Sequence, residues 1–312
     1  MREIILPEFP TRNPFPRLYV KERKKFGVDA EWKKPLPFFT LTYYALKEKP
    51  RIIEVHWHYP LVFSKFYPLT VLKTLLFPLD LFIASRLVSI FWVLHNLSHH
   101  EAKYPLCDYL ASFFLSLFCH RILVPCREAK DIIKRYFPPA RKRRVLWHTY
   151  AHPEYEIKKF DRKKVRKKLG IPERDFVFIT FGELRPYKRI EEIIRAFSSL
   201  ERNAWLIVAG KPYRFYGRRI KKEVEKSKRR ERILLFLRPL TDDELFMLLS
   251  ASDCAVFAMR KVLSSGSVLL AKKMGLFIVA PDRGCIPSYG VHILYKEDLK
   301  KAMERALCVF SG

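Results

Sequence analysis

The chain has 312 residues, of which 49% are hydrophobic, and a formal net charge of +28. At roughly 100–200 residues per domain, this length predicts two domains, each long enough to bury a core. The charge predicts an anionic partner: nucleic acid, an anionic membrane surface or a phosphorylated substrate. Residues 1–150 carry 25 Lys and Arg against 12 Asp and Glu, and the remainder contributes +15, which excludes a simple basic tail.

Apolar, β-branched segments alternate with amphipathic ones through the first half of the chain. Residues 13–32 indicate a loop, a helix that stops near Gly27, and a strand. The other predicted strands cover 1–10, 50–60, 88–96, 121–126 and 141–150, and predicted helices cover 104–120 and 127–137. This alternation predicts a parallel sheet with helices on both faces.

The most apolar stretch is residues 67–96. A membrane-spanning helix needs about 20 predominantly apolar residues. Here Lys73, Pro78, Asp80 and Arg86 interrupt the run, and the residues that follow are β-branched and aromatic. We therefore predict a helix followed by a buried strand, with a helix lying on the membrane surface as an alternative.

The second half begins after a polar, lysine-rich segment, residues 151–175, which indicates a linker and the start of another domain. Predicted strands then cover 176–184, 204–210, 233–237, 254–259 and 276–281, and predicted helices cover 189–200, 216–231, 241–252, 265–275 and 296–307. The fold class is thus α/β, with two doubly wound Rossmann-like domains, residues 1–155 and 156–312. Ligands of such sheets bind beyond the carboxyl ends of the strands.

Two loops after predicted strands have the chemistry of an anion site. In "FGELRPYKRIEEIIRAF", Gly182 ends a strand, and Arg185 and Lys188 precede a helix whose N-terminus favours a diphosphate. The alternative is an ordinary basic surface loop. In "KVLSSGSVLLAKKMG", small residues between a strand and a helix could donate hydrogen bonds to a phosphate; they are Ser264, Ser265, Gly266 and Ser267. Helix capping explains one serine, but not four small residues in a row.

Three histidines and a glutamate stand close together in "VLHNLSHHE". His95 ends a predicted buried strand, at the edge where ligands bind, whereas His99 and His100 lie in the following loop. These residues with Glu101 are poor metal ligands as a set because they straddle a strand end and a loop, so no metal site is predicted. His95 is a candidate base or sugar-positioning residue, with a satisfied core histidine as the alternative.

The order of these segments resembles a known family. "GELRPYKRIEEII", "LIVAG", "LTDDELFMLLSASDCAVF" and "SSGSVLLAKKMGLFIVAP" are together similar to retaining glycosyltransferases of the GT-B fold, a family that includes sucrose synthase and bacterial mannosyl- and glucosyltransferases. In the first half, "RNPFPRLYVKERKKFGV", "EVHWHYP" and "VLHNLSHHE" resemble its first loop and two strand ends. The likeness covers about residues 10–290.

The resemblance implies a hexosyltransferase with two domains facing a cleft. The first domain would hold a glycan or lipid-linked acceptor, and the second a nucleotide-sugar. Transfer would proceed with retention and without metal or other cofactor. The implied catalytic residues are His95, Arg185 and Lys188, and the implied binding residues are Asn13, His56, Gly182, Ser264, Ser265, Gly266 and Ser267. Val262 and Leu270 depart from the family, which commonly has glutamates there.

Two other hypotheses address the charge. A nucleic-acid-binding protein would be basic and aromatic-rich, but no zinc-finger spacing and no RNP or KH signature is present, so nucleic acid is not an expected partner. A protein that docks on anionic lipid, with a decayed transferase site, is the other. Docking is also compatible with catalysis. We expect a cytoplasmic protein, with peripheral attachment to the inner face of the cell membrane as a further hypothesis.

Overall fold

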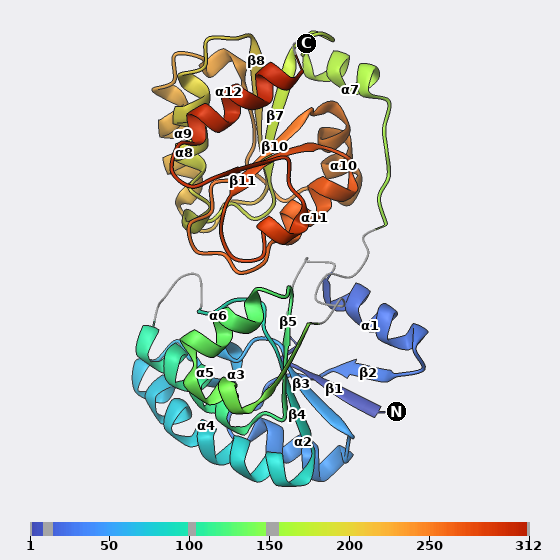
Figure 1. The fold of residues 1–312 in the computed structure, drawn as a ribbon, viewed down its shortest axis with the longest axis vertical. Coiled ribbons are helices and arrows are strands. Elements are labelled where there is room, and N and C mark those ends of the chain that lie inside the picture. The colour runs from blue at the N-terminus through green and yellow to red at the C-terminus, as the bar shows by residue number, and fades with distance from the viewer. Residues whose placement is uncertain (1, 9–14, 99–103, 148–155, 311–312) are drawn as a thin grey trace. The chain divides into compact units, whose positions relative to one another are not determined.

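The computed structural model describes residues 2–8, 15–98, 104–147 and 156–310. The chain divides into two compact units, residues 1–154 (unit 1) and 155–312 (unit 2), each built around its own parallel sheet (Figure 1). The units are described separately below.

Unit 1 contains a six-stranded sheet in the order β2-β1-β3-β4-β5-β6, with every neighbouring pair parallel. The strands are β1 (Arg2–Leu6), β2 (Asp29–Trp32), β3 (Ile52–Val55), β4 (Ser89–Val93), β5 (Arg121–Val124) and β6 (Arg144–Trp147). The helices are α1 (Phe15–Lys25), α2 (Thr40–Glu48), α3 (Tyr59–Val62), α4 (Tyr67–Leu87), α5 (Pro105–Phe118), α6 (Ala129–Tyr136) and the short 3-10 helix η1 (Pro138–Lys142). Helices α2, α4 and α5 pack side by side, whereas α1 packs on β1 and β2.

Unit 2 has the sheet order β12-β11-β10-β7-β8-β9, again parallel throughout. The strands are β7 (Phe176–Phe181), β8 (Ala204–Ala209), β9 (Ile233–Phe236), β10 (Cys254–Val256), β11 (Phe277–Pro281) and β12 (Ile293–Tyr295). The helices are α7 (Arg162–Leu169), α8 (Ile190–Ser198), α9 (Tyr216–Glu225), α10 (Asp242–Ala251), α11 (Gly266–Lys273) and α12 (Leu299–Val309), with 3-10 helices η3 (Pro186–Lys188), η4 (Arg230–Arg232) and η5 (Pro287–Tyr289). The strand order reverses between β7 and β10, so these two strands flank the switch point where such sheets bind ligands.

The core of unit 2 follows from hydrophobic spacing. Ile190, Ile193, Ile194 and Phe197 recur at helical intervals on α8 and are all buried, together with residues of α9 and α12 on the same side of the sheet (Figure 1). Strand β7 is buried over residues 177–181, as expected for a central parallel strand with helices on both faces. This rigid centre fixes the loop that follows β7.

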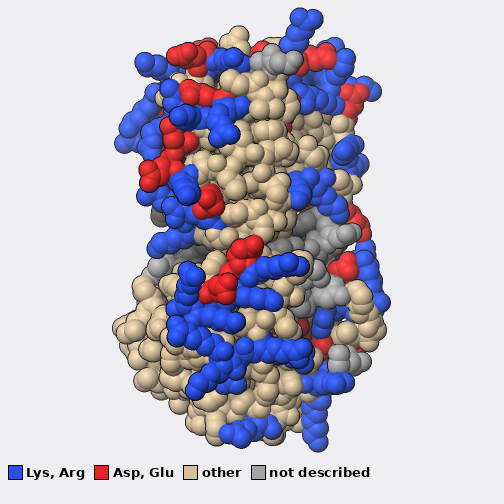
Figure 2. Space-filling model, viewed as in Figure 1, with Lys and Arg blue, Asp and Glu red and all other residues tan. Residues whose placement is uncertain are grey.

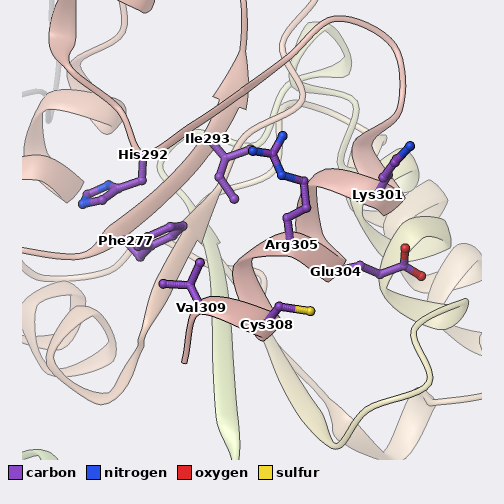
Figure 3. Close-up of a pocket in the computed structure, with 8 residues that line it drawn as sticks. All are labelled: Phe277, His292, Ile293, Lys301, Glu304, Arg305, Cys308 and Val309. Carbon is purple, nitrogen blue, oxygen red and sulfur yellow. The ribbon is translucent and has the colours of Figure 1, made fainter. Parts of the chain in front are cut away.

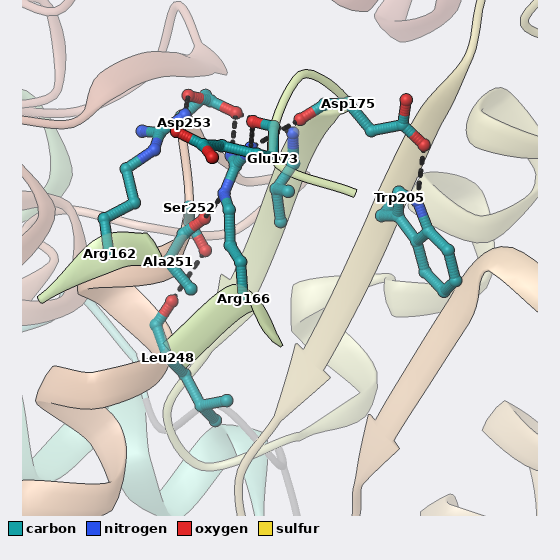
Figure 4. Close-up of polar contacts among 10 residues, drawn as sticks. Arg162, Arg166, Glu173, Asp175, Trp205, Leu248, Ala251, Ser252 and Asp253 are labelled. Atoms are coloured by element: carbon teal, nitrogen blue, oxygen red, sulfur yellow. Dashed lines mark hydrogen bonds and ion pairs between the residues drawn. The ribbon is translucent and has the colours of Figure 1, made fainter. Parts of the chain in front are cut away.

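A buried arginine joins α7 to the sheet of unit 2 (Figure 4). Arg166 is 1% exposed, and its guanidinium donates to the carbonyls of Ala251, Glu173 and Asp175 and to Asp253 Oδ2 at 2.7 Å. Burial lowers the pKa of Arg166, and Asp253 counteracts this shift. The guanidinium makes four hydrogen bonds and an ion pair with Asp253, and such pairing is the condition under which a charge can be buried.

The predicted α/β class with two Rossmann-like sheets is confirmed, including the succession of a helix and a strand in residues 67–96. The sequence analysis assigned no element to residues 40–48 or 293–295, which form α2 and β12. It also treated residues 151–175 as polar linker and domain start, and helix α7 lies within that range.

Candidate active site

Three of the predicted residues meet at the carboxyl end of β7. Gly182 directly follows β7 and has a φ of +94°. A Cβ atom built on Gly182 would lie 2.9 Å from Ser267 Oγ and 3.0 Å from Lys188 Nζ. Ser267 lies in the first turn of α11, the helix that follows β10, so residues from both sides of the switch point converge here. Glycine is therefore required at position 182 for both its backbone conformation and the room it leaves.

Lys188 lies in η3 and is only 8% exposed. Its Nζ donates a hydrogen bond to the Phe181 carbonyl at 3.3 Å. Burial lowers the pKa of Lys188 to about 8; Glu183 acts to raise it and Arg185 to lower it. A buried ammonium beside a strand end is well placed to bind an anion, because the charge is desolvated before the ligand arrives.

Arg185 lies on the same loop and is held on two sides. Its guanidinium stacks over the ring of Tyr213 at 4.7 Å and donates to Glu183 Oε1 at 3.1 Å. The stacking fixes the plane of the guanidinium, while its side chain keeps 24% of its surface accessible. Arg185 and Lys188 thus present two cations of different kinds along one short loop.

The helix N-termini near this loop differ. Helix α8 has Glu191 and Glu192 in its first turn, and they pair with Arg219 and Arg189 respectively. Helix α11 has no acidic residue in its first turn, and Ser265 caps it by accepting a hydrogen bond from the Val268 amide at 3.4 Å. The anion site indicated by the geometry is therefore made by Lys188 and the start of α11.

The remaining small residues of the second loop line the start of α11. Gly266 is its first residue and is exposed, whereas Ser265 is buried. The Tyr289 hydroxyl interacts with the Ser264 side chain and the Ser265 backbone, although burial keeps the pKa of Tyr289 raised. Leu270, where the family has a glutamate, is buried on the core side of α11.

In unit 1, two predicted histidines come together from adjacent strands. His56 follows β3 and His95 follows β4, and His56 Nδ1 lies 2.9 Å from His95 Nε2. His56 is 2% exposed, whereas His95 is half-buried. Trp57 stacks on the His95 ring at 4.5 Å with an interplanar angle of 15°. The rings are therefore held in one orientation by packing as well as by hydrogen bonding.

A buried polar network lies behind His56. Burial lowers the pKa of His56 to about 3, with a further contribution from Arg23, so the ring is neutral. Glu54 Oε2 accepts a hydrogen bond from the Tyr19 hydroxyl at 2.9 Å and lies 3.6 Å from His56 Nε2. The 3.6 Å separation is too long for a hydrogen bond, but the negative charge of Glu54 favours a ring N–H over a lone pair at His56 Nε2.

The other histidines of these segments do not contribute to the His56–His95 pair within the described residues. His58, in the same strand end as His56, is buried against Asp108 Oδ1 at 2.8 Å and is a satisfied structural residue. Asn13, His99, His100 and Glu101 lie outside the described residues. Within the described ranges, no three His, Cys, Asp or Glu side chains gather as a metal site.

A pocket of about 450 Å³ lies elsewhere in unit 2 (Figure 3). It is lined by Phe277, His292, Ile293, Lys301, Glu304, Arg305, Cys308 and Val309. Phe277 is the first residue of β11, so the pocket lies at the amino edge of the sheet, opposite the Gly182 loop. We do not include it in the candidate site, because parallel sheets bind ligands at the carboxyl edge.

Residues 161–292 match the model of the family described as glycosyl transferases group 1. This part of the chain is similar to the group 1 glycosyl transferases. The matched segment contains Gly182, Lys188 and Ser267. No curated protein matches the chain.

Solved structures share the fold of this chain over nearly its whole length. Sucrose-phosphate synthase from Thermosynechococcus elongatus has a TM-score of 0.74 at 12% identity, covering 98% of this chain and 89% of that one. HepE from Anabaena, in complex with UDP-glucose, has a TM-score of 0.71 at 12% identity, covering 99% and 89%. WaaG, a glycosyltransferase involved in lipopolysaccharide biosynthesis, has a TM-score of 0.62 at 11% identity, covering 99% and 90%.

Sequence reasoning missed several residues that shape the candidate site. Gly210 has a φ of +141°, and a Cβ there would lie 1.9 Å from the Gly182 carbonyl oxygen, so the ends of β7 and β8 approach closely only because of it. A glycine directly after a predicted strand was the available signal. Tyr213, Glu54 and Tyr19 had no local signal, because their partners are distant in sequence.

Proposed function

We propose that the protein transfers a sugar from a nucleotide-sugar to a glycan or lipid-linked acceptor, with unit 2 binding the donor and unit 1 the acceptor. The convergence of Gly182, Lys188 and Ser267 beyond β7 is the observation that carries the proposal. HepE supports the donor class, since its structure contains UDP-glucose.

Unit 2 would act by electrostatic stabilisation of the leaving group. As the bond between the anomeric carbon and the diphosphate oxygen breaks, negative charge grows on that oxygen. Lys188 and Arg185 would neutralise it, a contribution worth several kcal/mol where water is excluded, and the proposal needs no divalent metal for this step. Ser267, Ser265 and the start of α11 would hold the second phosphate and the sugar. Retention of anomeric configuration is part of the proposal.

Unit 1 would position the acceptor through His95. The contact between His56 Nδ1 and His95 Nε2 would orient the His95 ring, and this ring would contact a sugar hydroxyl of the acceptor as a base or as a hydrogen-bonding group. His56 is a positioning residue in this scheme, and Glu54 fixes its tautomer. Asn13 remains a proposed contact on the first loop.

The test is thermal stabilisation of the purified protein by UDP, GDP and ADP and their common sugar conjugates. Binding to the folded state raises the melting temperature by an amount set by ligand concentration over Kd. We expect one nucleotide to stabilise the protein and Lys188→Ala to lose that shift, while the exposed-lysine control Lys226→Ala keeps it. Stabilisation that survives in Lys188→Ala would contradict this assignment of the site.

A further inference from the structure

Helix α4 buries both polar and apolar side chains, and it also carries apolar side chains on its exposed face. Thr70, Thr74 and Asp80 are buried, whereas four large apolar side chains point outward: Leu72, Leu75, Leu79 and Phe82 are 46%, 67%, 47% and 43% exposed. These four residues are spaced three or four positions apart, which places them in one stripe along the helix. Scattered exposed leucines are normal, but a continuous exposed apolar stripe on a helix is not.

The buried polar residues explain why α4 cannot rotate to hide this stripe. Asp80 accepts hydrogen bonds from the backbone amides of Leu41 at 3.1 Å and Thr42 at 2.8 Å, and so caps the start of α2. Thr70 Oγ1 accepts from the Ser64 amide at 2.9 Å. Rotating α4 about its axis, so that its exposed side faced the core, would break these hydrogen bonds and bury four side chains where they do not fit. The exposed stripe is therefore a fixed feature of unit 1.

The stripe continues onto α5. Phe82 of α4 contacts Phe118 of α5, with 5.9 Å between ring centroids. Helix α5 contains no Lys or Arg, its one acid, Asp108, is buried, and Leu106 and Tyr109 are 68% and 40% exposed. We call the surface formed by these side chains the α4–α5 face; its members are Leu72, Leu75, Leu79, Phe82, Leu106 and Tyr109.

Cations border the α4–α5 face. Lys65 and Arg86 are exposed near the two ends of α4, and Arg86 lies over the Phe82 ring at 5.1 Å. Beyond α5, the η1 segment adds exposed Arg141 and Lys142. Figure 2 shows tan side chains on the side of unit 1 where Figure 1 draws α4 and α5, next to a band of Lys and Arg. An apolar surface with a basic border is typical of proteins that lie on anionic membranes.

We propose that the α4–α5 face docks unit 1 onto an anionic phospholipid surface, with α4 parallel to the membrane plane. The leucines and Phe82 would enter the boundary between headgroups and acyl chains, and the bordering cations would contact lipid phosphates. A second copy of the chain is a poorer occupant, because a symmetric contact would bring the same cations against one another.

Docking, rather than spanning, follows from how α4 is held. It is long and apolar enough to cross a membrane by length and composition, with a mean hydropathy of 1.4, but 33% of that window is buried within the unit. Leaving unit 1 would expose Asp80 to lipid and uncap α2. The proposal does not depend on the transfer reaction, so its test uses no activity measurement.

The experiment is co-sedimentation of the full chain with vesicles of phosphatidylcholine containing phosphatidylglycerol, and with vesicles of phosphatidylcholine alone. The variant is Leu75→Glu, and the matched control is Val309→Glu on unit 2, at a residue 62% exposed. Both remove one unit of net positive charge at an exposed apolar position, so general electrostatics is the same in each. Far-UV circular dichroism verifies that both variants are folded.

We expect the wild type and Val309→Glu to bind the anionic vesicles, and Leu75→Glu to bind them about tenfold more weakly, since an acid replaces the most exposed apolar side chain of α4. Equal binding by the two variants would overturn the proposed face. Failure of the wild type to bind anionic vesicles at low salt would overturn docking altogether. A wild-type dimer in analytical ultracentrifugation that Leu75→Glu converts to monomer, with no vesicle binding, would assign the face to a second copy instead.

Discussion

The replacement of Lys188 by methionine should stabilise the free protein while removing donor binding. Lys188 is buried at the end of β7, and its pKa of about 8 is well below the usual 10.5. The lowered pKa means that the folded protein holds the charged form at a cost, which an anionic ligand would offset. Methionine has a similar length and no charge, so it avoids that cost.

The size of the effect follows from the shift. About 2.5 pKa units at about 1.4 kcal/mol each correspond to an upper bound of ~3 kcal/mol. The hydrogen bond from Lys188 to the Phe181 carbonyl is lost in the variant and reduces the gain by about 1 kcal/mol. At about 2–4 °C per kcal/mol, the melting temperature of Lys188→Met should rise by several degrees near pH 7.

The pH dependence has a definite sign. Between pH 8 and about 10.5, the unfolded chain binds more protons at this lysine than the folded chain. The free energy of unfolding of the wild type therefore rises with pH in that window, as the cost of burying the charged lysine disappears. The advantage of Lys188→Met should therefore be full below pH 8 and disappear as pH approaches 10.5. Urea unfolding at pH 7, 8.5 and 10, with Lys226→Met as the exposed-lysine control, measures this directly.

Donor binding gives the second readout. Isothermal titration with the nucleotide that stabilises the wild type should show no measurable affinity for Lys188→Met. The wild-type Kd should weaken by up to about tenfold per pH unit above pH 8, as the free lysine loses its proton. A variant that is less stable than the wild type at pH 7 and still binds the nucleotide would refute both the burial cost and the anion site.

Three further predictions test other parts of the molecule. Gly210→Ala should cost several kcal/mol or prevent folding of unit 2, whereas Gly170→Ala, with positive φ but nothing within 4 Å of the added Cβ, should cost only about 1 kcal/mol in urea unfolding. Arg166→Met should lower the unfolding free energy by about 3–5 kcal/mol because a carboxylate loses its buried partner, and the exposed Lys167→Met should change it by less than about 0.5 kcal/mol. Glu54→Gln should lower kcat about tenfold or more with unchanged nucleotide affinity, since it disturbs the tautomer of the histidine pair; equal activity at all pH values would contradict that role.

The fold could be predicted from the sequence because its central elements carry local signals. Strand β7 is a continuous apolar run, and α8 places its isoleucines at helical intervals. Helix α2 had weaker signals: it starts at Phe39 in a left-handed conformation, without a side-chain cap of its own, and its N-terminus is completed by Asp80, about forty residues away. A helix whose cap comes from another element gives little local warning of where it begins.

The same contrast between local signals and partners distant in sequence applies to the residues of the candidate site. Gly182, Lys188 and Ser267 could be named from loops that follow strands, since the topology of a doubly wound sheet brings those loops to one edge. The pairing of Glu191, in the first turn of α8, with Arg219 of α9 needed the structure, because the two residues are distant in sequence. The network beneath His56 needed the structure, since it joins α1 to β3 through side chains far apart in sequence.

Burial, rather than net charge, distinguishes the functional cations of this strongly basic chain. A neighbouring tyrosine raises the pKa of the exposed Lys47, and a neighbouring glutamate raises that of the exposed Lys163. Burial lowers the pKa of Lys188, at the proposed donor site, and of Lys73, on the helix that carries the proposed docking face. Burial thus makes the charged form of these two lysines costly, and a bound anion would offset that cost. The exposed cations add attraction over distance, which salt screens, whereas these two contribute where the ligand makes contact.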